Sequence, residues 1–412
     1  MTTTTIERDC VIAGGGPAGM VLGYLLARAG LRVTVLEKHS DFFRDFRGDT
    51  IHPATIGLLG ELGLRDRFLR LPVNRIPSLD AVVDGQRMTM VDFRTLPKPN
   101  DFLVLAPQWD FLNFLADEAK EFSTFDLRMS TEATGLIVEG GAVRGLQATG
   151  SEGELEVRAT LTVAADGRSS VLRDAAGFVP DESGSPIDVL WFNLPKPADP
   201  PPPTLAYLSS EGMVLTIDRG TNYQSGMVIR KGGYDELRSA GLADLRARIV
   251  GAAPLLRPVV DTLADWDQIK LLSVQINRIP RWWRPGFIAI GDAAHAMSPM
   301  FGVGVNYAIQ DAVALANAIS GDLRFGFAPS DTLAAVQKRR EKPVATMQRL
   351  QRIGQNAIAK QRRGHRIAPR WALRALRVFL PLIRPLAARF IGLGLGREHV
   401  AAALRRREGD AR

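Results

Sequence analysis

The chain has 412 residues, enough for two or three domains, and its 46% hydrophobic and 23% charged residues are ordinary for a soluble globular protein. A single cysteine, Cys10, excludes an internal disulfide, and the five histidines show no paired spacing, so we expect no metal site. The net charge of +8 is unevenly spread, because residues 338–412 hold 20 basic and 4 acidic side chains (+16), which leaves −8 for the rest.

The N-terminus carries no visible targeting signal. The segment "MTTTTIERD" lacks a basic stretch followed by an apolar one. No run approaches the roughly 18 apolar residues that a membrane span needs. We therefore expect a cytoplasmic protein.

The first predicted elements form a strand, a tight turn, a helix and a second strand in "RDCVIAGGGPAGMVLGYLLARAGLRVTVLEK". Gly14, Gly16 and Gly19 fit G-x-G-x-x-G, in which the glycines permit the turn, the approach of a pyrophosphate and close packing of helix and strand. Glu37 ends the second strand, where its carboxylate can accept hydrogen bonds from a ribose. This arrangement predicts dinucleotide binding, without separating NAD from FAD.

A later strand, "TLTVAAD", ends at Asp166 and Gly167. An acidic residue and a glycine at the end of a buried strand suit a loop beside a ligand. A plain strand-to-turn junction has the same composition. The pattern alone leaves both alternatives open.

Residues 76–105 and 181–279 contain strand-like segments separated by proline-rich turns. They predict a sheet domain inserted into the chain. Tyr207, Arg219 and Tyr223 are candidates to line a substrate pocket there, with ordinary places in the sheet as the alternative.

A third strand–loop–helix pattern occupies "PGFIAIGDAAHAMSPMFGVGVNYAIQDAVALANAI". The strand ends at Gly291 and Asp292, the loop runs through Pro299, and a helix follows from about Gly302. Asp292 is placed to bind the hydroxyls of a ribityl chain, and the helix would direct its positive end toward a flavin ring. His295 is expected to be structural.

Residues 331–412 are predicted to be helical, basic and amphipathic. Two sets of side chains lie opposite each other on a helical wheel, an arginine arc of about 140° and an apolar set; they are Arg363, Arg366, Arg370, Arg374, Arg377, Arg384 and Arg389 against Phe379, Leu380, Leu382, Ile383 and Leu386. Prolines 369, 381 and 385 are expected to kink or break the helix. Two functions remain open, a cap on the cofactor domain or contact with an anionic membrane. No nucleic-acid motif accompanies the charge.

Taken together, three ordered stretches resemble the group A (single-component) flavoprotein monooxygenases of the para-hydroxybenzoate hydroxylase type, over about residues 9–320. The matching residues are Gly14-Gly15-Gly16-Pro17-Ala18-Gly19, Ala165-Asp166-Gly167, and Gly291-Asp292-Ala293-Ala294-His295 with Pro299, Gly302, Gly304 and Asn306.

The resemblance implies an α/β fold, with an FAD-binding Rossmann-like domain of the glutathione-reductase type, an inserted β-sheet substrate domain and a C-terminal helical region. The implied boundaries are 1–75, 106–180 and 281–330 for the FAD domain, 76–105 and 181–280 for the substrate domain, and 331–412 for the basic helical region.

The resemblance also implies a set of FAD contacts, which are Gly14, Gly16, Pro17, Ala18, Gly19, Glu37, Lys38, Arg47, Gln108, Ala133, Asp166, Gly167, Gly291, Asp292, Pro299, Gly302, Gly304, Val305 and Asn306. Arg47 is expected near the flavin, with an exposed surface arginine as the alternative. Gln108 is expected at the ribityl or phosphate part, with a simple role at the start of a helix as the alternative, and Ala133 is expected at the adenine. No catalytic residue is assigned, and the flavin pocket is expected around Pro299, Gly302 and Arg47.

The implied activity is hydroxylation of an aromatic, phenolic or quinone-like small molecule. In the family, NADPH or NADH binds transiently and reduces FAD, and O₂ is trapped as a flavin C4a-hydroperoxide that hydroxylates the substrate. The expected partners are therefore an aromatic or lipophilic small molecule and O₂. The alternatives are a flavin-dependent reductase of the geranylgeranyl-reductase type and a flavin-binding protein without turnover.

Overall fold

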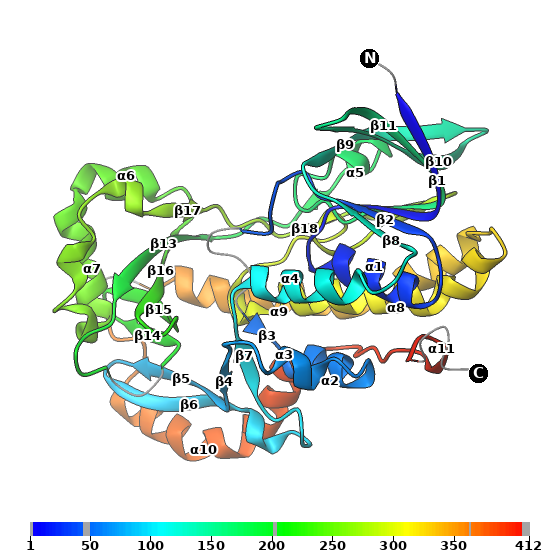
Figure 1. The fold of residues 1–412 in the computed structure, drawn as a ribbon. Coiled ribbons are helices and arrows are strands. Elements are labelled where there is room, and N and C mark those ends of the chain that lie inside the picture. The colour runs from blue at the N-terminus through cyan, green and yellow to red at the C-terminus, as the bar shows by residue number, and fades with distance from the viewer. Residues whose placement is uncertain (1–2, 44–49, 201–203, 362–363, 406–412) are drawn as a thin grey trace.

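The protein is a mixed α/β molecule, and its computed structural model describes residues 3–43, 50–200, 204–361 and 364–405 (Figure 1). An eight-stranded sheet contains the strands that lead into the first and the third of the three predicted cofactor-binding stretches. Its main path runs in the order β19 (Trp283–Arg284), β20 (Phe287–Ala289), β11 (Gly153–Ala164), β1 (Thr4–Ala13), β2 (Val33–Leu36) and β8 (Phe125–Arg128), and β10 (Ala142–Gly150) joins β11 to β9 (Thr131–Glu139).

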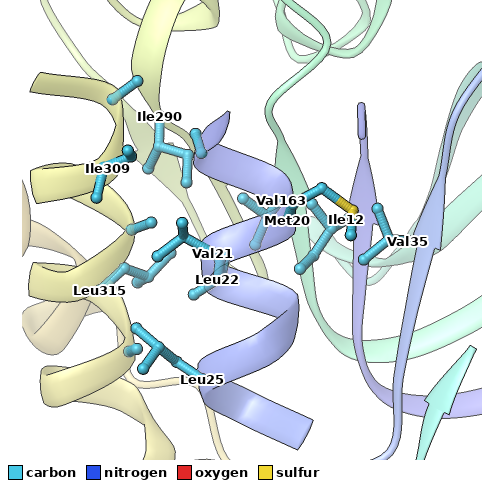
Figure 2. Packing of buried hydrophobic residues seen from close by; sticks show 14 of the residues in the cluster. Ile12, Met20, Val21, Leu22, Leu25, Val35, Val163, Ile290, Ile309 and Leu315 are labelled. Atoms are coloured by element: carbon cyan, nitrogen blue, oxygen red, sulfur yellow. The ribbon is translucent and has the colours of Figure 1, made fainter. Parts of the chain in front are cut away.

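Five neighbouring strands of this sheet, from β20 to β8, are parallel. The second part of β1 consists of apolar, fully buried residues such as Val11 and Ile12. Such a sequence is expected of a parallel strand that is covered on both faces. Figure 2 shows α1 (Pro17–Arg28) between α8 (Gly304–Arg324) and the strands that carry Ile12, Val35 and Val163. The α1 and α8 helices therefore fix the carboxyl ends of β1 and β20 in one core.

A seven-stranded sheet forms the second part of the molecule. Its order is β17 (Lys270–Leu272), β13 (Ile187–Pro195), β16 (Asn222–Arg230), β15 (Gly212–Asp218), β14 (Ala206–Ser209), β5 (Ser78–Val83) and β6 (Gln86–Asp92). All pairs are antiparallel except β14 with β5. Helices α6 (Tyr234–Ala240) and α7 (Leu242–Ala252) lie on one face of this sheet (Figure 1).

Two small sheets connect these parts. One has the order β3 (Thr50–Ile51), β7 (Leu103–Leu105) and β4 (Asn74–Ile76), and the other pairs β12 (Asp181–Glu182) with β18 (Asn277–Arg278). The short helices are α2 (Pro53–Glu61), α3 (Arg65–Phe68), α4 (Gln108–Ala119), α5 (Val171–Ala175), η1 (Phe93–Thr95), η2 (Pro254–Leu256), η3 (Val260–Thr262), η4 (Trp266–Gln268), η5 (Gly291–Ala293) and η6 (Met300–Gly302).

The C-terminal region divides between the two larger sheets. Helix α9 (Ser330–Ala359) packs against α8, whereas α10 (Arg370–Ala388) lies outside β5 and β6 of the seven-stranded sheet (Figure 1). The π-helical turn η7 (Arg389–Leu393) then leads the chain back, and α11 (Ala402–Arg405) ends beside α1, where the Nε of Arg28 donates to the carbonyl of Leu404.

The expected helix break is found at one of the three prolines. Helix α10 begins directly after Pro369 and continues through Pro381 and Pro385 without breaking. The apolar side chains of α10 do not cap the FAD-binding sheet, because Leu380 is buried on the other sheet and Phe379 and Leu382 are exposed.

Among the described residues, no helix combines the length and the apolar composition that crossing a bilayer would require.

Candidate functional site

The loops after β1, β11 and β20 meet at one edge of the parallel sheet, which is the usual position of a ligand in this architecture. Gly14 lies directly against the backbone of Ala165 and Asp166. The guanidinium of Arg168 donates to a carboxylate oxygen of Asp292 across 3.1 Å. The three separate sequence stretches therefore form one site.

The glycine-rich turn has the shape of a phosphate cradle. A Cβ on Gly14, whose φ is +105°, would lie 2.3 Å from the carbonyl oxygen of Ala165, and one on Gly19 would lie 2.0 Å from that of Gly14. A Cβ on Gly16 would meet nothing within 4 Å. Gly14 and Gly19 are thus required by the protein itself, whereas Gly16 leaves open space at the start of α1. That space, with the free N–H groups of a helix N-terminus, fits a pyrophosphate.

The acidic residue at the end of β2 is held in place by two backbone amides. The Glu37 carboxylate accepts from the N–H of Gly15 at 3.0 Å and from that of His39 at 3.1 Å, and the residue is 8% exposed. Lys38 lies 4.0 Å from Glu132 on the exposed side. Glu37 therefore sits beside the glycine turn, where the ribose of a dinucleotide would lie.

Asp166 accepts hydrogen bonds from the first turn of α5, the short helix after β11, whose N-cap is Ser170. Its carboxylate accepts from the hydroxyl of Ser170 at 2.5 Å and from the N–H of Leu172 at 3.3 Å. Burial raises the pKa of Asp166, and these hydrogen bonds oppose the rise. The side chain therefore organises the Gly167 turn, as a strand-to-turn junction requires, and contact of this loop with a ligand stays a prediction.

The loop before α8 contains two consecutive residues in the left-handed region, Phe301 (φ 68°) and Gly302 (φ 63°). They form the extra turn η6, so α8 begins at Gly304, two residues later than expected. Pro299, the N-cap of η6, is partly exposed, and the Gly304 Cβ position is open.

The carbonyl oxygen of Gly302 is held by two side chains that the sequence analysis did not single out. The hydroxyl of Thr50 donates to it at 3.0 Å, and Nε2 of the fully buried His52 lies 2.9 Å from it. Nδ1 of His52 lies 2.8 Å from the carbonyl oxygen of Ile391 in η7. Burial lowers the pKa of His52, while both carbonyls act to raise it. His52 thus connects the loop before α8 to the C-terminal turn.

Asn306, in the first turn of α8, offers an unused donor. Its Oδ1 accepts from the hydroxyl of Thr55 at 3.0 Å, but its buried Nδ2 has no hydrogen-bond partner among the described residues. A buried amide without a partner is costly unless a ligand satisfies it. The residues present therefore fit a cofactor that brings a hydrogen-bond acceptor to this loop.

Beneath the loop lies a buried ionic cluster that the sequence analysis missed. Asp311 of α8 accepts from the N–H of Gly291 at 3.2 Å, from Nε of Arg340 at 2.8 Å, and lies 2.5 Å from Nε2 of His295. Asp311 and Arg340 are fully buried. Burial would raise the pKa of Asp311, but His295 and Arg340 outweigh it and hold the pKa below the ordinary value. His295 is therefore structural, as expected.

Of three further predicted cofactor residues, two lie near the start of a helix or strand and one lies outside the residues that the structure describes. Gln108 begins α4, and Ala133 lies near the start of β9, both partly exposed. Arg47 lies outside the described residues. The FAD contacts assigned to all of these positions stay predictions.

Two of the three substrate candidates lie on one face of the seven-stranded sheet, and the third, Arg219, lies in the turn between β15 and β16. Tyr207 and Tyr223 are buried with α7, and burial raises the pKa of both phenols. Arg219 lies toward α4, where its charge acts to lower the pKa of Asp110 while burial raises it. A role in substrate binding stays a prediction for all three residues. For the two tyrosines it is not favoured, because they lie on the face of the sheet that α7 covers.

Comparison with known proteins follows this geometry. A family model described as "FAD binding domain" matches residues 7–350. The chain belongs to this FAD-binding family. It is also 34% identical over 353 residues to a 6-methylpretetramide 4-monooxygenase of Streptomyces rimosus, a match that spans 83% of this chain and 82% of that protein.

Two further proteins are similar to this chain, one in sequence and one in structure. A digeranylgeranylglycerophospholipid reductase of Methanocella arvoryzae is 26% identical, over 78% of this chain and 79% of its own. The solved structure of OxyS anhydrotetracycline hydroxylase from Streptomyces rimosus superposes with a TM-score of 0.75 at 22% identity, covering 96% of this chain and 78% of that chain. This likeness confirms the expected fold class.

The family membership confirms the resemblance to group A flavoprotein monooxygenases and the FAD cofactor, with NAD(P)H as the reductant typical of the family. The chain is an FAD-dependent monooxygenase of this group. The individual FAD contacts and the domain boundaries remain predictions.

Replacing Glu37 by alanine is expected to weaken FAD binding without unfolding the protein. The change removes the carboxylate that aligns Gly15 and would bind the ribose, and a hydrogen bond to a charged group contributes about 1.5–3 kcal/mol. The dissociation constant should therefore rise by roughly 10-fold to 150-fold. Fluorescence titration of the apoprotein with FAD measures it.

The matched control for Glu37→Ala is Glu139→Ala. Glu139 lies at the far end of β9, where its exposed carboxylate pairs with Arg158 at 2.8 Å. Equal FAD affinities for wild type and Glu37→Ala would contradict the ribose role.

Proposed function

We propose that this enzyme hydroxylates a polycyclic phenolic or quinone-like small molecule, with NAD(P)H and O₂ as cosubstrates. The observation that carries the proposal is the similarity to the 6-methylpretetramide 4-monooxygenase, which extends over more than four-fifths of both chains. The similarity therefore includes much of the region that forms the seven-stranded sheet as well as the FAD-binding strands, and a shared substrate class is the simplest reason for it.

When bound, FAD supplies the redox chemistry, in which it takes electrons from NAD(P)H and activates O₂. The protein supplies binding, orientation and electrostatics. Glu37 and the open space at Gly16 would hold the ADP part, and Asp292 would hold the ribityl chain. The N–H groups from Gly302 to Asn306, at the positive end of α8, would stabilise negative charge at the edge of the ring.

The substrate would lie between this loop and the seven-stranded sheet. Trp191 on β13 and Gly226 on β16 are direct cross-strand neighbours, and a Cβ on Gly226 would come within 3.1 Å of the Trp191 ring. Gly226 therefore allows the indole to lie flat over β16. The indole is 7% exposed and belongs to the same apolar cluster as Val189 and Ile217, and an apolar face of this kind suits an aromatic substrate and helps to exclude water.

Gln224 provides polar recognition on the same face. Its Oε1 accepts from both Nε and an Nη of Arg219, at 3.1 and 2.8 Å, which fixes the orientation of the amide. Its Nε2 is buried and has no partner among the described residues. Nε2 is thus available to donate to a phenolate or carbonyl oxygen of the substrate.

The second candidate is a flavin-dependent reductase, favoured by the 26% identity to the digeranylgeranylglycerophospholipid reductase. Such an enzyme would add hydride to a double bond and need no O₂. The higher identity and the polar donor at Gln224 favour hydroxylation.

With a suitable polycyclic phenol present, NAD(P)H oxidation is expected to accelerate at least tenfold, with one O₂ consumed for each NAD(P)H. The reason is that the described strands and helices include no second nucleotide-binding turn of the kind at Gly14, so reduction can wait for the substrate. Stopped-flow reduction without air and an oxygen electrode measure the two quantities.

Gln224→Leu is the matched variant for this measurement. It should raise KM for the phenol while leaving the FAD content unchanged, because Gln224 lies on the sheet and not in the glycine turn. Substrate turnover that proceeds at full rate without O₂ would establish the reductase instead.

We further propose that the enzyme is cytoplasmic and acts on a lipophilic substrate in peripheral contact with an anionic membrane. The basic C-terminal region supports this, since residues 338–412 have a net charge of +16. No known nucleic-acid-binding motif accompanies that charge.

A further inference from the structure

We propose that the solvent-facing side of α10 is an interfacial membrane anchor, with Trp371, Phe379 and Leu382 entering the headgroup region of an anionic bilayer. The inference deepens the peripheral contact proposed above, on which it rests, by naming the surface and the way it binds.

The first observation is an exposed apolar face. Large hydrophobic side chains project from α10 with exposed fractions that are high for such residues, namely Trp371 72%, Val378 70%, Phe379 60%, Leu382 74%, Ile383 48% and Leu386 68%. Single exposed hydrophobic residues are common in soluble proteins, but a contiguous set on one helix marks an interaction surface.

The second observation is how little of α10 faces the protein. Leu373 and Leu380 are buried against Ala81 and Met88 of the seven-stranded sheet, and Ala388 is buried near Val91. The Nε of Arg384 donates to the carbonyl of Thr89. This narrow stripe fixes the helix to the sheet and leaves the wide apolar arc toward solvent.

The third observation is charge. Arg374 and Arg377 are exposed beside the apolar arc, and the sequence contains no Asp or Glu between Glu341 and Glu398. A second copy of the chain docking through α10 would bring these arginines together without acidic partners on the helix. An anionic lipid surface complements both the charge and the apolar face.

The geometry favours a helix that lies flat in the interface. The described helices include none that could span a bilayer. Helix α10 lies at the outer edge of the molecule, outside β6, so a planar surface can approach it (Figure 1). A basic helix with Trp, Phe and Leu on one face is the usual form of such an anchor.

The position of α10 links the anchor to the active site. Its buried stripe lies on the face of the sheet that carries Trp191 and Ile217, and η7 continues from α10 to the contact between Ile391 and His52. A lipophilic substrate held in the bilayer would therefore be concentrated beside the substrate face.

The test is flotation of the full-length FAD-loaded enzyme with vesicles of phosphatidylcholine alone or mixed with phosphatidylglycerol. We expect binding to the anionic vesicles at low salt, and weaker binding at high salt because salt screens the arginines. Brominated lipids should quench tryptophan fluorescence, and Trp371→Phe should remove that quenching.

Two double variants separate the apolar and the charged contributions. One variant, Phe379→Ser with Leu382→Ser, removes apolar side chains from the interface. The other, Arg374→Glu with Arg377→Glu, removes two positive charges that contribute about 1 kcal/mol each near an anionic surface. Each double variant should weaken vesicle binding at least tenfold. The controls are Val179→Ser and Arg238→Glu, which change an exposed valine and an exposed arginine elsewhere and should bind as wild type.

Absence of binding to anionic vesicles at low salt overturns the proposal, and so does wild-type binding by the Phe379/Leu382 variant. A dimer in solution that the same variant converts to a monomer, without vesicle binding, would assign the face to a second copy instead. FAD content and hydroxylation of a water-soluble phenol should be unchanged in the variants, so failure of the anchor is distinct from failure of the proposed activity.

Discussion

Replacing Asp311 by alanine is expected to lower the free energy of unfolding by about 3–5 kcal/mol, because it removes one partner of a fully buried ion pair. Arg340 would remain buried beside an empty position, since it is fully inaccessible and its Nη2 already has no partner among the described residues. The loss also frees the N–H of Gly291 in the third motif, so FAD binding should weaken together with stability. Urea unfolding and FAD titration measure the two effects.

The matched control is Asp66→Ala. Asp66 pairs with Arg65 at 3.1 Å, but its side chain is 80% exposed, so its loss should change stability by at most about 1 kcal/mol. Equal unfolding free energies for Asp311→Ala and Asp66→Ala would contradict the role of the buried cluster.

The pH dependence gives Asp311 a separate signature. Its pKa in the folded protein lies below the ordinary value of 3.8, so its charged form stabilises the fold fully above that value. The stabilisation is lost as the pH falls through the folded pKa. The stability difference between wild type and Asp311→Asn should therefore shrink in strongly acidic solution.

Replacing Gly16 by valine should give a folded protein that no longer retains FAD. Gly16 has an ordinary extended backbone (φ −73°, ψ −177°), and its Cβ position is empty of protein atoms, so the protein itself accepts a side chain. The pyrophosphate would lose that space. Loss of a single charged hydrogen bond corresponds to roughly 10-fold to 150-fold in affinity, and the cradle contributes several.

Three other glycines sharpen this experiment. Gly14→Val and Gly19→Val should unfold the protein, since their Cβ atoms would lie 2.3 and 2.0 Å from backbone oxygens. Gly321→Ala on α8, where the space is also open, should change neither folding nor FAD binding. Thermal unfolding of the apoproteins and fluorescence titration with FAD decide among these outcomes. A Gly16→Val protein that binds FAD as tightly as wild type would remove the cradle from the site.

The cofactor turn was predictable because its physics is local. The backbone approaches itself so closely at Gly14 and Gly19 that neither position tolerates a side chain. The glycine spacing within a few residues of sequence is therefore enough to predict the turn. The sequence predicted the start of α8 at about Gly302, whereas the helix begins at Gly304, because Phe301 adopts a left-handed conformation that is unusual for phenylalanine.

The buried cluster and the orientation of α10 were not predictable in the same way. Asp311 and Arg340 are 29 residues apart on two helices, and no local pattern pairs them. A helical wheel separates the arginines of α10 from its apolar residues, but it does not say which arc meets the protein. The structure buries Leu373 and Ala388, which belong to neither set, together with Leu380 of the apolar set.

The return of the chain to α1 has a consequence for biosynthesis. The carbonyl of Leu404 pairs with Arg28, 376 residues earlier, and the N–H of Val400 pairs with Glu61, 339 residues earlier. Both contacts join a late segment of the chain to helices that are synthesised much earlier. The nucleotide-binding sheet therefore receives these contacts only after residues 400–404 have been synthesised, and nascent chains halted before Glu398 should be more sensitive to protease than chains that extend past Arg405.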